Sequence, residues 1–254
     1  MSVMRHVKAS FRRLFSAPVD IENSWIKGPA RAEEMVRFQS WFDKTKSLDE
    51  TRGRACFDWE QRITDFSEWH QVDKRTCLEI GFGGGRLLAR ASLDFKQVYG
   101  VDIHSHFSRS AQYLIQERVD NYHLLTRPQL EELPDASCDF IFSFIVFQHF
   151  ATFDEVDYYL AQIRRLLSSR GVCHLFFRRE SFTTESVRVV APCDFKLRHS
   201  SLFLNPSYFR SHLSHRFFIM SYEDVLQPSR SQSSARAKVE GQARVLFRNM
   251  SPKD

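Results

Sequence analysis

The chain has no apolar run of the 18 or so residues that a membrane-spanning helix requires. Its five cysteines include no C-x-x-C pair, and an odd number does not fit a framework of disulfides. These absences argue against a transmembrane or a disulfide-rich secreted protein, so we expect reduced cysteines, no metal site and a cytoplasmic location. Cys77, Cys138 and Cys173 lie in or beside apolar segments, and we predict that they are small buried side chains.

The dinucleotide-binding fingerprint is also absent, although the segment that comes nearest to it is informative. Residues 77–86 predict a buried strand with an acid, then a glycine turn, then the start of a helix. A G-x-G-x-x-G fingerprint needs its third glycine where Arg86 stands, whereas here the third glycine is Gly85. Glycine permits tight turns and close approach of a ligand to the backbone, and a helix start offers free N–H groups. The pattern therefore predicts a ligand site and disfavours a nicotinamide oxidoreductase.

A second acid follows at the distance expected of a nucleotide fold. Residues 98–101 predict a short strand, and Asp102 comes directly after it, about 20 residues beyond the first glycine. A carboxylate at this place accepts hydrogen bonds from both hydroxyls of a ribose. The alternative is that Asp102 caps a helix that begins near Ser105.

Further blocks follow in a fixed order. Residues 133–143 read L-P-D-A-S-C-D-F-I-F-S and predict a fourth strand. A helix is expected over residues 153–167, ending before Gly171, and a fifth strand over residues 172–177.

Together these blocks resemble the class I S-adenosylmethionine (SAM) dependent methyltransferases, of the type 11/25 kind that acts on small molecules. G-x-G-x-G is similar to the first motif of that family, and residues 133–143 are similar to its L-P-x-x-x-x-F-D-x-V-x-S block. The resemblance covers roughly residues 75 to 180. It implies an α/β fold: a Rossmann-like, doubly wound, seven-stranded sheet, mostly parallel with an antiparallel last strand, preceded by a helical N-terminal extension.

The resemblance also implies a cofactor and the residues that hold it. The cofactor is SAM, and its expected contacts are Glu79, Gly81, Phe82, Gly83, Gly85, Asp102, Ile103, Gln129 and Phe144. One departure from the family concerns adenine. The acid that usually takes the adenine amino group is missing, and Gln129 is the residue that offers a side-chain oxygen in its region.

The reacting face is expected at the carboxyl ends of the fourth and fifth strands. His149 is the titratable group after the fourth strand, and its type suits a general base near neutral pH or a positioning role. Arg178 and Arg179 leave the fifth strand and are candidates for binding a carboxylate or phosphate of the substrate. The alternative for each arginine is a solvent-exposed side chain. We therefore expect methyl transfer to oxygen or nitrogen of a small molecule, with an anionic group as one possibility.

Base-modifying chemistry lacks its signatures. Residues 143–148 read S-F-I-V-F-Q, without the prolines of the [DNS]-P-P-[YFW] block of amino-methylating enzymes, and Cys138 lies at the wrong end of the strand for attack on a pyrimidine. The net charge of +5 is partly carried by the flanks, so nucleic acid is not the expected partner. Two alternatives stay open: an RNA methyltransferase of another type, and a non-catalytic binding protein on the same scaffold.

Three regions are predicted along the chain. Residues 1–19 contain basic but no acidic side chains and form an amphipathic segment, which suits peripheral membrane contact, an organelle-targeting segment or a frayed helix. Residues 20–75 predict helices, as a packed layer or as a lid over cofactor and substrate. Residues 76–254 form the SAM-binding domain, with an insertion at 181–215 whose helix begins at Asn205-Pro206.

Overall fold

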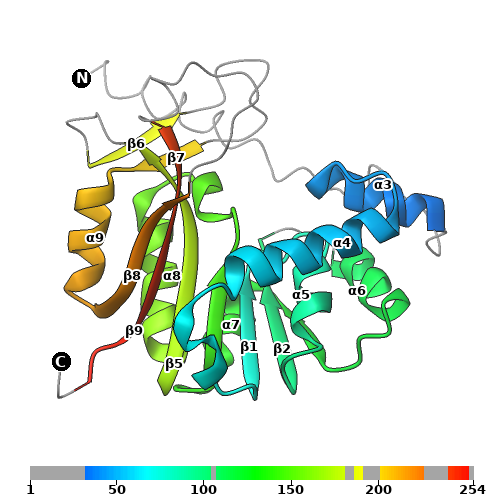
Figure 1. Cartoon of the computed structure of the whole chain (residues 1–254), viewed down its shortest axis with the longest axis horizontal. Helices are drawn as coiled ribbons and strands as arrows, with labels where there is room; N and C mark the ends of the chain where they lie inside the picture. Colours follow the sequence, from blue (N-terminus) through cyan, green and yellow to red (C-terminus); the bar gives the residue numbers. More distant parts are fainter. Residues whose placement is uncertain (1–31, 104–106, 181–185, 191–200, 226–239, 252–254) are drawn as a thin grey trace, which may run out of the picture.

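The computed structural model describes residues 32–103, 107–180, 186–190, 201–225 and 240–251 (Figure 1). Within them a single sheet runs in the order β3-β2-β1-β4-β5, and β9 and β8 continue it beyond β5. The bounds of these strands are β1 (Thr76–Ile80), β2 (Gln97–Val101), β3 (Tyr122–Leu125), β4 (Cys138–Ser143), β5 (Leu167–Glu180), β8 (Phe217–Val225) and β9 (Glu240–Asn249). The first five strands are parallel to one another.

The last strand is antiparallel, as predicted. β9 pairs antiparallel with β5 on one side and with β8 on the other. The predicted seven-stranded doubly wound sheet is therefore confirmed, with one addition. A hairpin of β6 (Val187–Val190) and β7 (Ser201–Leu204) joins the carboxyl end of β5 through the pair Arg179 and Leu204. The sequence indicated only a helix within the insertion at 181–215, because a short irregular hairpin leaves no clear alternation.

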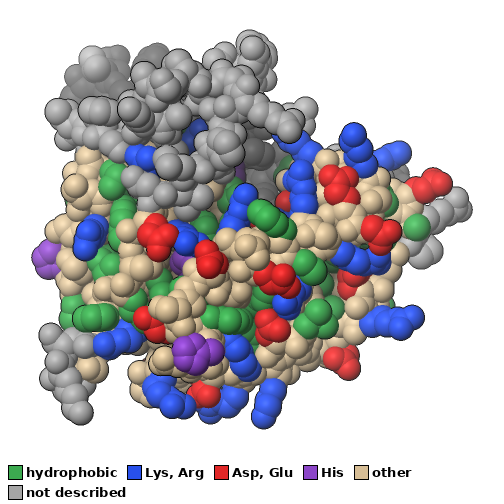
Figure 2. Space-filling model, viewed as in Figure 1, with side chains coloured by type: hydrophobic (Ala, Val, Ile, Leu, Met, Phe, Trp, Pro, Cys, Tyr) green, Lys and Arg blue, Asp and Glu red, His purple; other side chains and the backbone are tan. Residues whose placement is uncertain are grey.

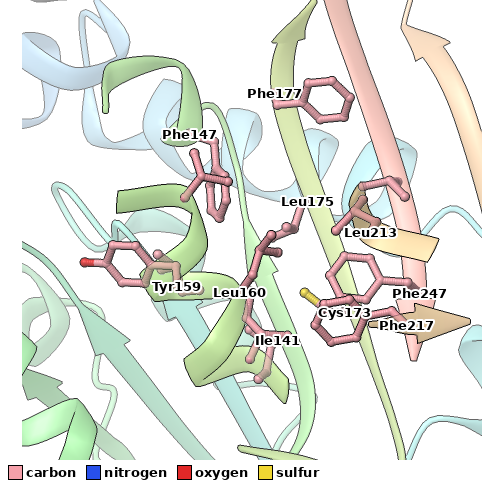
Figure 3. Packing of buried hydrophobic residues seen from close by; sticks show 14 of the residues in the cluster. Ile141, Phe147, Tyr159, Leu160, Cys173, Leu175, Phe177, Leu213, Phe217 and Phe247 are labelled. Atoms are coloured by element: carbon pink, nitrogen blue, oxygen red, sulfur yellow. The ribbon is translucent and has the colours of Figure 1, made fainter. Parts of the chain in front are cut away.

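The two faces of the sheet bury different cores, because successive strand residues point to opposite sides. On one face Leu78 and Ile141 pack against α8 (Phe153–Leu166) and α9 (Pro206–Ser214). Figure 3 shows this cluster, with the sulfur of Cys173 among aliphatic and aromatic carbons. On the other face Cys77 and Phe140 pack against α5 (Arg86–Ala91) and α6 (Phe107–Gln116). The strand cysteines are buried, as predicted.

The N-terminal helices form a layer over the sheet. α3 (Ala32–Asp43) buries Met35 and Phe38, and α4 (Leu48–Asp58) follows it. The helical structure predicted for residues 20–75 is interrupted after α4: a π-turn occupies Trp59–Ile63 and a 3-10 turn occupies Ser67–Gln71. The wider π-turn still places Trp59 against the sheet, edge-on to Phe140 and Phe142. Figure 1 shows α4 lying across the upper ends of β1 and β2, with α3 further to the right, above α6.

The insertion helix begins where its sequence predicted. The Asn205 side chain accepts hydrogen bonds from the backbone N–H groups of Ser207 and Tyr208, and Pro206 occupies the first helical position. No helix within the described ranges is long and apolar enough to cross a membrane. The predicted amphipathic segment at 1–19 and the proposed cap near Ser105 lie outside the described residues.

A buried histidine joins the N-terminal layer to the sheet. His174, on β5, is 1% exposed, and its Nδ1–H donates to the carbonyl oxygen of Ile63 at 2.8 Å. Its ring packs between Phe66 and Phe176. Burial lowers the pKa of His174 to about 4, against an ordinary value of 6.5, because the charged ring would lose its hydration.

This histidine predicts acid sensitivity. Between pH 6.5 and pH 4 the unfolded chain binds a proton at His174 that the folded chain does not, so the free energy of unfolding falls as pH drops through this window. The full effect is about 3 kcal/mol at 1.36 kcal/mol per pKa unit. Urea unfolding at pH 7 and pH 4 should show a smaller loss for His174→Gln, which does not titrate, than for the natural chain. Equal losses in the two proteins would contradict the assignment.

Candidate functional site

The glycine turn at the end of β1 has the backbone that only glycine adopts freely. Gly81, Gly83 and Gly85 have φ values of 80°, 50° and 85°. A Cβ on Gly81 would lie 2.4 Å from a methyl carbon of Val146, so the strand end and the loop after β4 meet without room for a side chain. Gly85 immediately precedes α5, whose first N–H groups therefore face the same turn.

The turn is held from two neighbouring elements. Asp102, directly after β2, accepts a hydrogen bond from the Gly83 N–H at 2.9 Å, and Ser110 of α6 donates to the Gly83 carbonyl at 2.8 Å. Asp102 is 8% exposed. The predicted pairing of the glycine turn with this acid at one edge of the sheet is present, and one carboxylate oxygen of Asp102 orders the turn itself.

Helix α3 packs directly on the glycine turn. The Gln39 side chain is fully buried and donates through Nε2 to the Gly84 carbonyl at 2.7 Å. A Cβ on Gly83 would meet the ring of Phe42 at 3.0 Å, and one on Gly84 would meet Gln39 at 2.5 Å. The N-terminal layer therefore covers the turn rather than lying elsewhere on the sheet.

Arg86, the first residue of α5, connects that helix to the N-terminal layer. Its Nε lies 2.6 Å from Asp43 at the end of α3, and its Nη2 lies 2.8 Å from Asp58 at the end of α4. All three side chains are at most 17% exposed. Burial raises the pKa of Asp43, while the Arg86 guanidinium acts in the opposite direction. The residue that breaks the dinucleotide fingerprint is thus a buried bridge between three helices.

Glu79 supplies a buried acid beneath the turn. It is 3% exposed, and no hydrogen-bond donor in the described part of the chain reaches its Oε2. Burial raises the pKa of Glu79 well above its ordinary value, Arg86 opposes this rise, and the nearby Asp102 adds to it. A buried acceptor without a donor is unusual in a folded protein. It marks a position where a cationic or N–H group of a ligand would be stabilised.

The remaining predicted cofactor residues fall into three situations. Phe82 is buried and stands edge-on to Phe107, whereas Ile103, next to Asp102, is 59% exposed. Phe144 is 8% exposed and lies beside Phe176. Gln129 does something else: its side-chain oxygen accepts hydrogen bonds from the Thr126 N–H and hydroxyl and so caps α7 (Arg127–Glu132). That engagement argues against Gln129 as the acceptor for adenine.

The loop after β4 carries backbone strain and the candidate histidine. Ile145 has a φ of 62°, a conformation that β-branched residues rarely adopt and that concentrates at functional sites. His149 ends the 3-10 turn Phe147–His149 and is exposed, and its Nε2 lies 3.2 Å from the Nε2 of Gln148. The loop reaches the glycine turn through the contact of Val146 with Gly81.

Neither candidate arginine is simply solvent-exposed. Arg178 is half-buried, and its guanidinium lies 4.6 Å from the ring centre of Phe203 on β7. Arg179 is 4% exposed and pairs in register with Leu204 on β7 and Gly241 on β9. At the carboxyl end of β5, beside the added hairpin, Arg179 is therefore buried and Arg178 is partly covered.

Sequence reasoning missed several residues of this site. Gln39, Phe42 and Ser110 come from helices that carry no motif, and nothing in their spacing pointed to the glycine turn. Arg86 was noticed only as a missing glycine. The sequence did offer a signal, because Arg86 stands at the start of a helix and an acid stands near the end of each of the two preceding helices. Only the fold brings Arg86 and these acids together.

Residues 78–192 match a family model described as a methyltransferase domain. The chain carries a class I SAM-dependent methyltransferase domain. SAM is the cofactor of this class. No curated protein compared with the chain matches it.

Several solved structures have a fold similar to that of this chain over most of its length. One is 1,6-didemethyltoxoflavin-N1-methyltransferase from Burkholderia thailandensis, at 17% identity and a TM-score of 0.56 over 89% of this chain and 94% of that one. A SAM-dependent methyltransferase from Clostridium acetobutylicum gives 12% identity and a TM-score of 0.54 over 79% and 98% of the two chains. The [4+2]-cyclase SpnF gives 14% and 0.58 over 81% and 83%. At these identities the likeness shows the fold.

The residues present at the site of the methyltransferase domain fit SAM. The glycine turn, which has no side chains, leaves room for the methionine part of the cofactor, and Asp102 can accept from the two hydroxyls of its ribose. The exposed apolar side chain of Ile103 can contact the base, and the buried Glu79 oxygen can accept from the ammonium group. The match rests on the Glu79 Oε2 atom, because the residues that the structure describes supply no hydrogen-bond donor to it.

Proposed function

We propose that this chain transfers a methyl group from SAM to an oxygen or nitrogen of a small molecule that carries a negative charge. The observation that supports this most is the contact of Val146 with Gly81, because the loop of the strained Ile145, which leads to His149, thereby meets the glycine turn. Arg178 follows on β5, the strand that pairs with β4. SAM, when bound, supplies an electrophilic methyl carbon, so the protein needs only to align the acceptor and manage its proton.

Each group then has a role in the proposal. The glycine turn, Glu79, Asp102, Ile103 and the loop at Phe144 hold the cofactor. Arg178, stacked on Phe203, presents a cation to an anionic group of the substrate. His149 meets the acceptor, as a general base or as a hydrogen-bonding group that positions it. Helix α3, which packs on the turn through Gln39, and α4, which is joined to Arg86 through Asp58, act as the cover that keeps water away.

The charge distribution supports a small substrate rather than nucleic acid. On the face in Figure 2, lysine and arginine side chains are interspersed with acidic ones over the N-terminal helices and the sheet edge. Binding along a phosphate backbone relies on basic side chains clustered on one face. A separate proposal is that residues 1–19 bind the surface of a membrane. Co-sedimentation with anionic vesicles of the full chain and of a chain without residues 1–19 tests it.

Binding comes first in the test. Isothermal titration should give heat with SAM and with S-adenosylhomocysteine and none with NAD. Clear heat with NAD and none with the two sulfur compounds would overturn the proposal.

Activity is the second test. Labelled SAM incubated with a metabolite extract should transfer its methyl group to small molecules, and His149→Ala should slow this transfer about 100-fold while leaving SAM binding unchanged. The matched control is His123→Ala, an exposed histidine stacked on Tyr99 and remote from the turn. Binding of SAM without any methyl transfer would instead favour the non-catalytic binding protein.

A further inference from the structure

Two glutamines connect the C-terminal strand to the candidate histidine. Gln242 lies on β9 directly opposite Arg178 of β5, and its Nε2 donates to the Oε1 of Gln148 at 3.3 Å, across a separation of 94 residues. Gln148 in turn places its Nε2 at 3.2 Å from the Nε2 of His149. Directly opposed residues of an antiparallel pair share a face, so Gln242 and Arg178 emerge on the same side of the sheet.

The direction of these hydrogen bonds follows from the atoms. An amide oxygen only accepts and an amide nitrogen only donates. Because the Gln148 oxygen takes the hydrogen bond from Gln242, the atom that it turns to His149 is its nitrogen. A ring nitrogen that faces an amide donor must offer its lone pair, so the neutral His149 ring carries its hydrogen on Nδ1.

We propose that Gln242 is a positioning residue which, through Gln148, holds His149 as the Nδ1–H tautomer. We further propose that the methyl acceptor is an oxygen already ionised, such as a carboxylate, because such an oxygen needs no base and the nearby Arg178 cation favours an anion over a neutral amine. This rests on the proposed function only in placing His149 at the acceptor. With its Nε2 lone pair engaged by Gln148, the histidine does not take a proton there. In this proposal His149 orients the methyl acceptor through its Nδ1–H, and the reaction includes no deprotonation of the acceptor.

The transfer balances without a base. A lone pair of the acceptor oxygen forms the bond to the methyl carbon as the carbon–sulfur bond breaks, and that bonding pair stays on sulfur, which becomes a neutral thioether. The substrate loses its negative charge and no proton moves. Arg178, whose guanidinium lies over the Phe203 ring and which is paired in register with Gln242, would bind such an anion in its charged form.

The test reads the tautomer directly, without a substrate. In the full-length, ¹⁵N-labelled protein at pH 8, above the ordinary histidine pKa of about 6.5, long-range ¹H–¹⁵N spectra distinguish Nδ1–H from Nε2–H. His149→Gln identifies the signals that belong to His149. The natural chain should show Nδ1–H as the dominant tautomer, by about tenfold or more.

Gln242→Glu should reverse the relay, by which we mean the two hydrogen bonds that join Gln242, Gln148 and His149. The introduced carboxylate only accepts, so it turns the Gln148 nitrogen toward itself and the Gln148 oxygen toward His149, which favours Nε2–H. Gln116→Glu, at an exposed position of α6, is the matched control and should change nothing. An Nε2–H ring in the natural chain, or an unchanged tautomer in Gln242→Glu, would overturn the positioning role.

The acceptor class has its own readout. If an oxygen such as a carboxylate is methylated, the labelled product is an ester that releases labelled methanol in mild alkali, whereas an N-methyl product overturns the acceptor class and leaves the relay standing. No methyl transfer at all defeats the proposed function, while the tautomer measurement still decides the relay. The two failures are therefore distinguishable.

Discussion

Arg86→Met should lower the free energy of unfolding by about 3 to 5 kcal/mol, which is the range for removing one partner of a buried ion pair. The substitution keeps the side-chain volume but leaves Asp43 and Asp58, at most 17% exposed, without their shared cation. Both acids terminate N-terminal helices, so the loss should fall on the contact between that layer and the glycine turn. Urea unfolding measures the change, and limited proteolysis should cut α3 and α4 earlier than in the natural chain.

The same helix offers a matched control. Arg90, one turn further along α5, pairs with Glu60 and Asp94, whose side chains are 54% and 29% exposed. Because solvent screens such pairs, Arg90→Met should cost less than about 1 kcal/mol. Adding Asp43→Asn to Arg86→Met should recover part of the loss, since one unpaired buried charge is removed. Equal effects of the two arginine variants would show that burial of the Arg86 bridge contributes nothing.

Asp102→Ala should weaken the binding of S-adenosylhomocysteine by about 100-fold or more. Two hydrogen bonds from ribose hydroxyls to a charged acceptor contribute about 1.5 to 3 kcal/mol each, and the variant also removes the acceptor of the Gly83 N–H. Asp102→Asn keeps one accepting oxygen without the charge, so we expect a loss of about 10-fold. Isothermal titration gives both dissociation constants.

An acid away from the site provides the comparison. Asp135 precedes β4, at the opposite edge of the sheet, and its side chain is 77% exposed beside Arg165. Asp135→Asn should bind S-adenosylhomocysteine as tightly as the natural chain. If Asp102→Ala binds within twofold of the natural chain while remaining folded, the ribose assignment of Asp102 is wrong.

The motif-bearing half of the chain could be predicted because its constraints are local. Gly81, Gly83 and Gly85 each adopt a positive φ, which is why glycine stands there, and the acid after β2 meets them because carboxyl ends of neighbouring parallel strands share an edge. The helix start at Asn205-Pro206 was predictable for the same reason: a cap is written within three or four residues.

The parts that were not predicted depend on contacts between distant segments. The β6–β7 hairpin has no regular alternation, and its place is fixed by one register pair with β5. The interruption at Trp59–Ile63 coincides with the packing of Trp59 on the sheet, a contact with residues distant in the sequence. Gln129 looked like a ligand for adenine, yet Thr126, three residues earlier, takes its oxygen as a helix cap.

By itself, then, the sequence determined a strand, a glycine turn, an acid and a second strand with its acid, in an order that specifies a parallel sheet with a nucleotide-like ligand at one edge. Those features are short-range and follow from backbone freedom and strand polarity. Tertiary structure alone decided what surrounds the glycine turn and the loop after β4: Gln39 and Arg86 bring the N-terminal helices onto the turn, and Gln242, near the end of the chain, donates to Gln148 beside His149. Each of these is a contact across many residues, which no spacing in the sequence encodes.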